Sequence, residues 1–144
     1  MRVMGIDLGQ RRVGIAISDA LRVIAQPLQT LQRPRTEEAL VAAIVALCEE
    51  HEVSEIVIGL PRHMDGREGD GAAEARRITT MLEAQGRKVA LWDERMTTMG
   101  AARALREMGV KREKQRGAID QVAAQMILEG YMQRIAPPKN YDEE

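Results

Sequence analysis

Runs of apolar residues at the start of the chain have the alternation of β-strands. Residues 2–8 and 12–18 are strand-like segments with only three residues between them, which predicts an antiparallel hairpin. Within 12–18 the side chains sort by size, because one face carries the bulky Val13, Ile15 and Ile17 and the other carries Gly14, Ala16 and Ser18. A third strand is expected at 24–31, and Pro27 within it indicates an edge strand or a bulge.

The pattern then changes to helices alternating with strands. Residues 36–51 place apolar side chains three and four residues apart, and Thr36 is the expected N-cap of this helix. The remaining predicted elements are a strand at 56–60, a polar loop at 62–71, a helix at 72–85, a strand at 87–92, a short helix from Thr97 or Thr98 to Met108, and a last helix at 115–134. Three antiparallel strands followed by helix crossovers predict an α/β fold. Its mixed five-stranded sheet, antiparallel first and then parallel, is flanked by helices.

The length of 144 residues fits one domain, which we expect to span residues 1–136. Pro137 and Pro138 begin a tail, 137–144, that we expect to be disordered. No apolar run is long enough to cross a bilayer, and the first residues lack a signal peptide. A single cysteine, Cys48, fits a reducing compartment, so a cytoplasmic protein with no membrane contact is expected.

The formal net charge of −1 argues against a nucleic-acid binder that relies on bulk positive charge. The charges are unevenly spread, however. Residues 1–35 carry six basic and two acidic side chains, residues 36–86 carry four and eleven, and residues 87–134 carry ten and six. Two basic segments that meet in space would form a local positive face on a neutral protein. A chance distribution over solvated surfaces is the alternative.

Three acidic residues occupy positions where an apolar side chain is usual. Asp7 interrupts the first strand, Glu94 directly follows the 87–92 strand, and Asp120 lies among alanine, isoleucine and valine in the last helix. Clustered carboxylates without His or Cys partners select Mg²⁺ or Mn²⁺ over Zn²⁺. Each acid also has an ordinary interpretation. Asp7 could close the hairpin turn, Glu94 could pair with a nearby arginine on the surface, and Asp120 could be an N-cap or a solvated helix residue.

Small residues surround these positions. The face of the hairpin that carries Asp7 also carries Gly5 and, on the partner strand, Gly14, which predicts a groove in place of a packed core. Ala123 and Ala124 share a helix face with Asp120 and would let that helix lie close to the sheet. The same alanines are also compatible with ordinary close packing.

Four segments together resemble one known family. They are GIDLGQRRVGIAISD (5–19), IVIGLPRHMDG (56–66), DERMTT (93–98) and the stretch 114–128 containing DQVAA. They are similar to the YqgF/RuvX family of small bacterial proteins in the RNase H-like nuclease superfamily. The resemblance covers residues 2–134, with the motifs in the family's order.

The resemblance implies a nuclease with an RNase H-like fold, in which Asp7, Glu94 and Asp120 are both catalytic residues and metal ligands. It implies two Mg²⁺ or Mn²⁺ ions, and such ions cleave phosphodiesters in line to leave 5′-phosphate and 3′-hydroxyl ends. Family members are similar to Holliday junction resolvases and are assigned to maturation of the 5′ end of 16S rRNA. The resolvases carry a further acid at the position of Ala123, so its absence weighs against junction resolution here. Asp93 is a candidate for an additional carboxylate.

Basic residues near the three acids are candidates for sequence-independent phosphate contacts. Arg12 matches an arginine of the family's pattern. The other nucleic-acid-binding candidates are Arg95, Lys111, Arg112, Lys114 and Arg116. Aromatic residues make up only 2% of the chain, which argues against recognition by base stacking. The expected partners are RNA, as pre-rRNA in ribosomal precursor particles, and branched DNA.

Three other functions are compatible with these motifs. A Holliday junction resolvase would cut four-way DNA and act as a homodimer, whereas an RNA nuclease can act as a monomer. The Gly5–Gly9 hairpin also resembles that of actin-like sugar and acetate kinases, but those enzymes need two such domains. A non-catalytic module that binds RNA or the ribosome is the third, and the presence of all three acids weighs against it.

Overall fold

A computed structural model describes residues 1–63, 65–94 and 112–135 of the chain. Five strands form one sheet in the order β3-β2-β1-β4-β5. The hairpin of β1 (Arg2–Leu8) and β2 (Arg12–Ser18) is antiparallel, and β3 (Ala25–Gln32) continues it in the same sense. On the other side β4 (Val53–Leu60) and β5 (Lys88–Asp93) run parallel to β1. The mixed five-stranded sheet of the predicted α/β fold is therefore confirmed.

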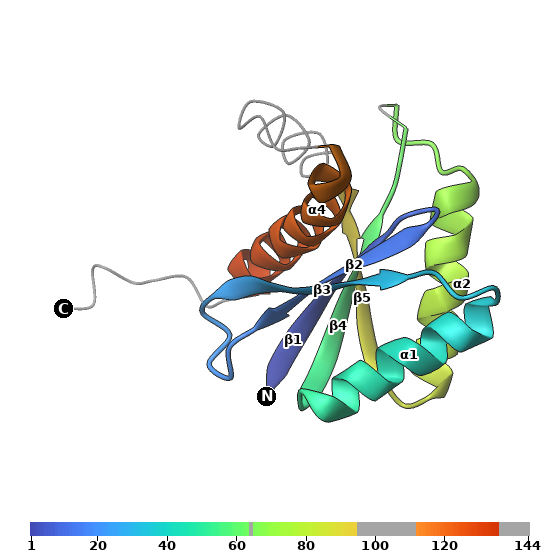
Figure 1. The fold of residues 1–144 in the computed structure, drawn as a ribbon. Helices are drawn as coiled ribbons and strands as arrows, with labels where there is room; N and C mark the ends of the chain where they lie inside the picture. The colour runs from blue at the N-terminus through green and yellow to red at the C-terminus, as the bar shows by residue number, and fades with distance from the viewer. Residues whose placement is uncertain (64, 95–111, 136–144) are drawn as a thin grey trace.

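The helices form a layer on each face of the sheet (Figure 1). Helices α1 (Glu37–Glu50) and α2 (Asp70–Ala84) cover one face, and α4 (Arg112–Ile135) crosses the other. The predicted short helix ending at Met108 and the tail 137–144 lie outside the described residues. In the parts of the chain that are described, no helix is long and apolar enough to cross a membrane.

Local sequence signals explain where these elements begin and bend. The Thr36 hydroxyl accepts a hydrogen bond from the Ala39 backbone N–H at 3.1 Å, so Thr36 is the N-cap of α1 as predicted. Strand β3 lies at the edge of the sheet, and its register with β2 shifts beside Pro27, so the proline marks both an edge and a bulge. Strand β4 begins at Val53, three residues before the predicted start.

The alternation of side chains along the strands divides the core in two. Bulky residues of the hairpin, such as Ile6 and Ile15, face α1 and α2 and are fully buried there. Smaller residues, such as Ala16, face α4 together with Val57 and Leu128. The predicted division of 12–18 into a bulky and a small face is confirmed, and it decides which helix can approach the backbone most closely.

Candidate active site

The carboxyl ends of β1 and β5 bring two of the predicted acids to one edge of the sheet. Asp7 is the penultimate residue of β1, and Glu94 directly follows β5. Both strands run parallel to β4, which lies between them, so their carboxyl ends point in the same direction. Ligand sites in open α/β sheets lie at such ends.

Asp7 and Glu94 form a hydrogen-bonded pair of carboxyl groups, of which Asp7 is buried and Glu94 is partly exposed. Asp7 is only 9% exposed. Burial, a hydrogen bond with the Glu94 side chain and the negative charge of Glu94 together raise the pKa of Asp7 to about 9. At neutral pH, therefore, Asp7 keeps its proton and is hydrogen-bonded with Glu94. A cation that binds both side chains would take the place of this proton.

Asp120 reaches the same region from α4, but it is held by an arginine. The Arg12 Nε donates to Asp120 Oδ2 at 2.9 Å, and both side chains are partly buried. Burial raises the pKa of Asp120; the Arg12 guanidinium opposes this shift, and the nearby charge of Asp7 adds to it. In this arrangement no three His, Cys, Asp or Glu side chains of the described residues are placed to hold a metal ion together. Asp120 lies near enough to Asp7 for their charges to interact, and its carboxylate is paired with Arg12.

The ordinary interpretations of the three acids are not supported. The hairpin turn is closed by the backbone, where the Gly9 N–H donates to the Arg12 carbonyl at 2.9 Å, and Asp7 pairs with Gly14 inside the ladder. Asp120 lies well inside α4 and is not its cap. Glu94 is only partly exposed and hydrogen-bonds with Asp7, so it is not simply a surface ion-pair partner.

Glycines in the sheet let α4 pack closely against the strands, which places Asp120 beside β1 and β2. A Cβ placed on Gly14 would lie 2.0 Å from the Asp120 carbonyl oxygen, and one on Gly5 would lie 2.7 Å from the Ala124 carbonyl oxygen. A Cβ on Gly59 would lie 2.8 Å from Cγ of Glu94. The predicted groove over these small residues is therefore wrong: α4 packs against them, because the absence of side chains allows the helix backbone to fill that space.

The connection after β4 borders the site on another side. Arg62 lies 3.9 Å from a carboxylate oxygen of Asp93 and 3.5 Å from one of Glu68. The turn beyond it is closed by the Gly66 N–H, which donates to the His63 carbonyl at 2.8 Å. The sequence predicted a polar loop here but gave no sign that Arg62 would pair with Asp93 and Glu68. Asp93, the candidate additional carboxylate, forms an ion pair with that arginine.

Of the predicted nucleic-acid-binding residues, the structure describes the side chain of Arg12 alone. Arg12 lies in the site, where it lines a polar hollow of about 530 Å³ together with Gly9, Gln10, Arg11 and Asp120. Arg95 and Lys111 lie outside the described residues. The three other candidates belong to the first turns of α4, and their side chains are not described: Arg112, Lys114 and Arg116.

A buried carboxylate with several partners, Glu55, lies at the opposite end of the sheet, and the sequence pattern did not predict it. Glu55 is 4% exposed and accepts a hydrogen bond from the Tyr131 hydroxyl, while Arg22 and Lys88 lie 3.4 and 3.3 Å from it. An acid within the apolar run of β4 was the available signal. The Glu55 carboxylate is matched by the Tyr131 hydroxyl and by two cations, so it links α4 to the sheet. Its oxygens are already occupied, which makes it a poor metal ligand.

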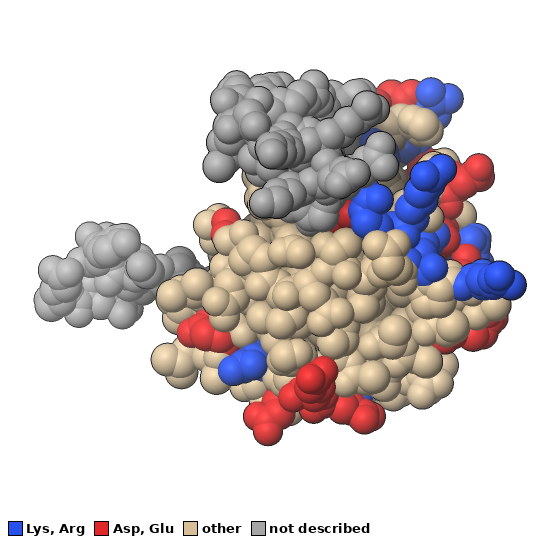
Figure 2. Space-filling view, in the orientation of Figure 1, with Lys and Arg blue, Asp and Glu red and all other residues tan. Residues whose placement is uncertain are grey.

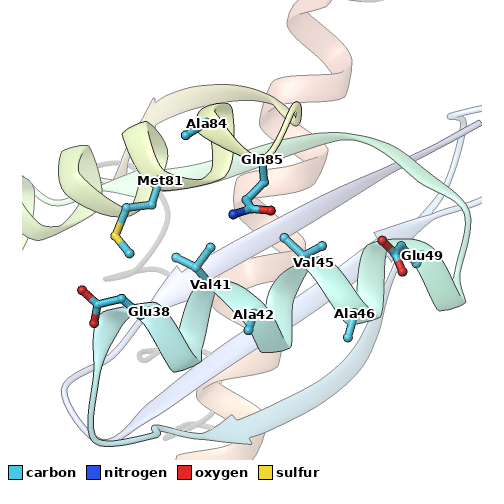
Figure 3. A pocket seen from close by; sticks show the side chains of 9 residues that line it. All are labelled: Glu38, Val41, Ala42, Val45, Ala46, Glu49, Met81, Ala84 and Gln85. Atoms are coloured by element: carbon cyan, nitrogen blue, oxygen red, sulfur yellow. The ribbon is translucent and has the colours of Figure 1, made fainter.

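A hollow of about 480 Å³ between α1 and α2 lies on the face of the sheet away from α4 (Figure 3). Its walls are largely apolar, with Val41 and Val45 from α1 facing Met81 from α2, and Glu38 and Glu49 stand at its ends. No group that suits phosphodiester chemistry converges there. The carboxylate edge is the better candidate for the active site.

The fold defines the class of protein to which this chain belongs. The structure is similar to that of Thermus thermophilus RuvC in complex with a Holliday junction substrate. The match covers 94% of this chain and 96% of that chain, with a TM-score of 0.55 at 15% sequence identity. A ROK family protein from Streptococcus pneumoniae in complex with sucrose has a TM-score of 0.50, but only 40% of that chain is covered. The chain has the RNase H-like α/β fold, with acids at the carboxyl edge of its sheet.

The chain belongs to the RuvX family, whose model, described as a Holliday junction resolvase, matches residues 1–134. A relative in Myxococcus xanthus, named as a candidate pre-16S rRNA nuclease, is 45% identical over 96% of this chain and 91% of its own. One in Halothermothrix orenii with the same name is 44% identical over 92% of this chain and 94% of its own. The family predicted from the four motifs is confirmed.

Proposed function

We propose that this protein is a divalent-metal-dependent nuclease that hydrolyses RNA and matures the 5′ end of 16S rRNA in the cytoplasm. The observation that carries the proposal is the hydrogen-bonded carboxyl pair of Asp7 and Glu94 at the carboxyl edge of the sheet, with Asp120 of α4 nearby. The names of the relatives point to the same reaction and substrate. Residues 1–136 form the nuclease domain in this proposal.

The donor set fits Mg²⁺ or Mn²⁺. Asp7, Glu94 and Asp120 supply only oxygen ligands, and a hydrogen-bonded carboxyl pair gains a strong partner when a cation replaces its proton. Two bound ions would supply a water of lowered pKa and a counter-charge for the leaving oxygen, giving 5′-phosphate and 3′-hydroxyl products. Asp7 and Glu94 would hold the ions at the carboxyl edge of the sheet, and Asp120 would complete the ligand set from α4.

Arg12 has two roles in this proposal. In the structure its guanidinium pairs with Asp120, whose charge is otherwise penalised by burial. If Asp120 turned towards a cation, the Arg12 guanidinium would be free to bind a ligand in the polar hollow that both residues line. A guanidinium binds a phosphate through paired hydrogen bonds, so Arg12 is placed to hold the scissile strand.

Junction resolution is the second candidate, because the family description and the likeness to RuvC both point to it. One residue weighs against it. The resemblance to resolvases implies an acid at position 123, but Ala123 is fully buried. A carboxylate cannot replace that methyl group without costly desolvation. RNA is therefore the preferred substrate.

Cleavage assays on three substrates test the proposal. Wild-type protein and Asp7→Asn are offered single-stranded RNA, a 5′-extended 16S precursor and a four-way DNA junction, each with Mg²⁺, Mn²⁺ or EDTA. We expect wild-type cleavage of the RNA substrates only with metal, and a loss of at least about 10³-fold in the variant. Equal cleavage by both proteins would refute the proposal, and cutting of the junction alone would favour the resolvase. Binding without cleavage would favour a non-catalytic module.

A further inference from the structure

Most arginines of the described chain are paired with carboxylates. Those with an acidic oxygen within 4.0 Å are Arg12, Arg22, Arg33, Arg62, Arg67, Arg76, Arg77 and Arg87. Four arginines have no such partner among the residues whose side chains are described: Arg2, Arg11, Arg35 and Arg134. Of these, Arg11 and Arg35 lie on neighbouring segments of the fold. Both side chains are also exposed. An arginine that no acid neutralises keeps its full charge available for a ligand.

These two unpaired arginines lie on neighbouring segments. Arg11 is in the turn between β1 and β2, and its carbonyl accepts a hydrogen bond from the Arg33 backbone N–H at 3.0 Å. Arg35 follows two residues later and directly precedes Thr36, the N-cap of α1. Figure 2 shows basic side chains gathered at this end of the molecule, where Figure 1 places the β1–β2 turn and the connection from β3 to α1.

The backbone at this position is held firmly. The hydrogen bond from Gly9 to Arg12 closes the turn, and the β2–β3 ladder extends to the pairing of Arg12 with Gln32. Arg33, next in the chain, forms an ion pair with Glu74 of α2 at 2.7 Å. Arg11 and Arg35 therefore project from segments that do not need to reorganise to bind, which lowers the entropic cost of binding.

A polar hollow lies between one of these arginines and an acid of the site. The hollow of about 530 Å³ is lined by Arg11 together with Arg12 and Asp120. A polynucleotide whose scissile phosphate lies at the acids would pass through the hollow and meet Arg11 first. Arg35 lies on the adjoining segment, so one strand can contact both.

We propose that the RNA strand leaves the active site across the β1–β2 turn and that Arg11 and Arg35 each bind one of its backbone phosphates. This inference rests on the proposed nuclease function and names the path of its substrate. The contacts are to phosphates, so they position the strand without selecting its sequence. Arg11 and Arg35 are positioning residues that do not touch the reacting atoms.

The test compares two double variants with the same change in net charge. Arg11→Ala/Arg35→Ala removes the proposed contacts. Arg2→Ala/Arg134→Ala removes two arginines that also lack an acidic partner among the described residues but belong to the start of β1 and the end of α4. Affinity for a labelled single-stranded RNA is measured by fluorescence anisotropy from 50 to 300 mM salt. All proteins carry Asp7→Asn, so the probe stays intact.

We expect the Arg11→Ala/Arg35→Ala variant to bind RNA about tenfold or more weakly at 100 mM salt. The slope of log affinity against log salt should fall in magnitude by about 1.4. That slope corresponds to about 0.7 for each lost phosphate contact on a single strand. The Arg2/Arg134 pair is expected to leave the slope unchanged. Equal effects of the two double variants would show a bulk charge effect and overturn the proposed RNA path. An unchanged slope in Arg11→Ala/Arg35→Ala would also overturn it.

Cleavage assays separate this inference from the proposed function. They use the same double variants without the Asp7→Asn substitution. We expect kcat at saturating RNA close to wild type and kcat/KM reduced in proportion to affinity, because the contacts are remote from the reacting atoms. Wild-type cleavage combined with unchanged kcat/KM in Arg11→Ala/Arg35→Ala would refute the path alone. Failure of the wild type to cleave any RNA would refute the function. A loss of affinity for a four-way DNA junction but not for RNA would overturn the assignment to RNA.

Discussion

Replacing Gly14 with alanine should move α4 and disable the site without touching an acidic side chain. A Cβ at this position would lie 2.0 Å from the Asp120 carbonyl oxygen and 2.3 Å from its carbonyl carbon, whereas ordinary contacts begin at 3.4 Å. Because the obstacle is helix backbone, the helix must shift by about 1.4 Å, the difference between those distances. Overpacking of this kind lowers the free energy of unfolding by about 1–3 kcal/mol.

The effect on cleavage should be larger than the effect on stability. A misplacement of about 1 Å at a catalytic group costs about 10²-fold in rate, so metal-dependent RNA cleavage should fall at least that far. Unfolding in urea and cleavage of single-stranded RNA measure the two effects. Gly71→Ala is the matched control, since its Cβ would meet only the side chain of Pro61, with Cγ at 3.0 Å and Cβ at 3.9 Å, and the stability change should be below about 1 kcal/mol. Wild-type stability and cleavage in Gly14→Ala would refute the reasoning.

Three further predictions address other parts of the molecule. Tyr131→Phe removes a hydrogen bond to the Glu55 carboxylate and should lower the free energy of unfolding in urea by about 1.5–3 kcal/mol, whereas an unchanged value would show that this bond does not fasten α4. Because the folded pKa of Asp7 is raised to about 9, the metal-free protein should lose stability as pH rises from about 4 to about 9. In thermal unfolding with EDTA, Asp7→Asn should therefore be more stable than wild type at pH 8, and Mg²⁺ should raise the Tm of wild type more at pH 8 than at pH 5. An equal Mg²⁺ effect at both pH values would contradict the raised pKa of Asp7. Burial raises the pKa of the Cys48 thiol to about 11, so a thiol reagent at pH 8 should label this residue only after unfolding, and rapid labelling of the folded protein would contradict its burial.

The sequence predicted the order of the described elements because each has a strong local signal. The hairpin follows from two alternating runs with a three-residue turn, and α1 follows from Thr36 and the spacing of its apolar residues. The limits of the elements were less certain. Strand β4 extends back to Val53 because Glu55, an acid in an apolar strand, is matched by Tyr131 and two cations that come from distant parts of the chain.

The sequence by itself singled out the three acids, since a carboxylate in an apolar strand or helix face needs a compensating partner wherever the chain folds. Only the tertiary structure decided which partner each has. Asp7 pairs with Glu94 because parallel strands bring their carboxyl ends to one edge, and Asp120 pairs with Arg12 because Gly14 lets α4 rest on the sheet. The small residues predicted an open groove, yet they are buried under α4. Spacing along the chain shows that side chains are small, but the element that fills the space they leave is set by packing across the whole fold.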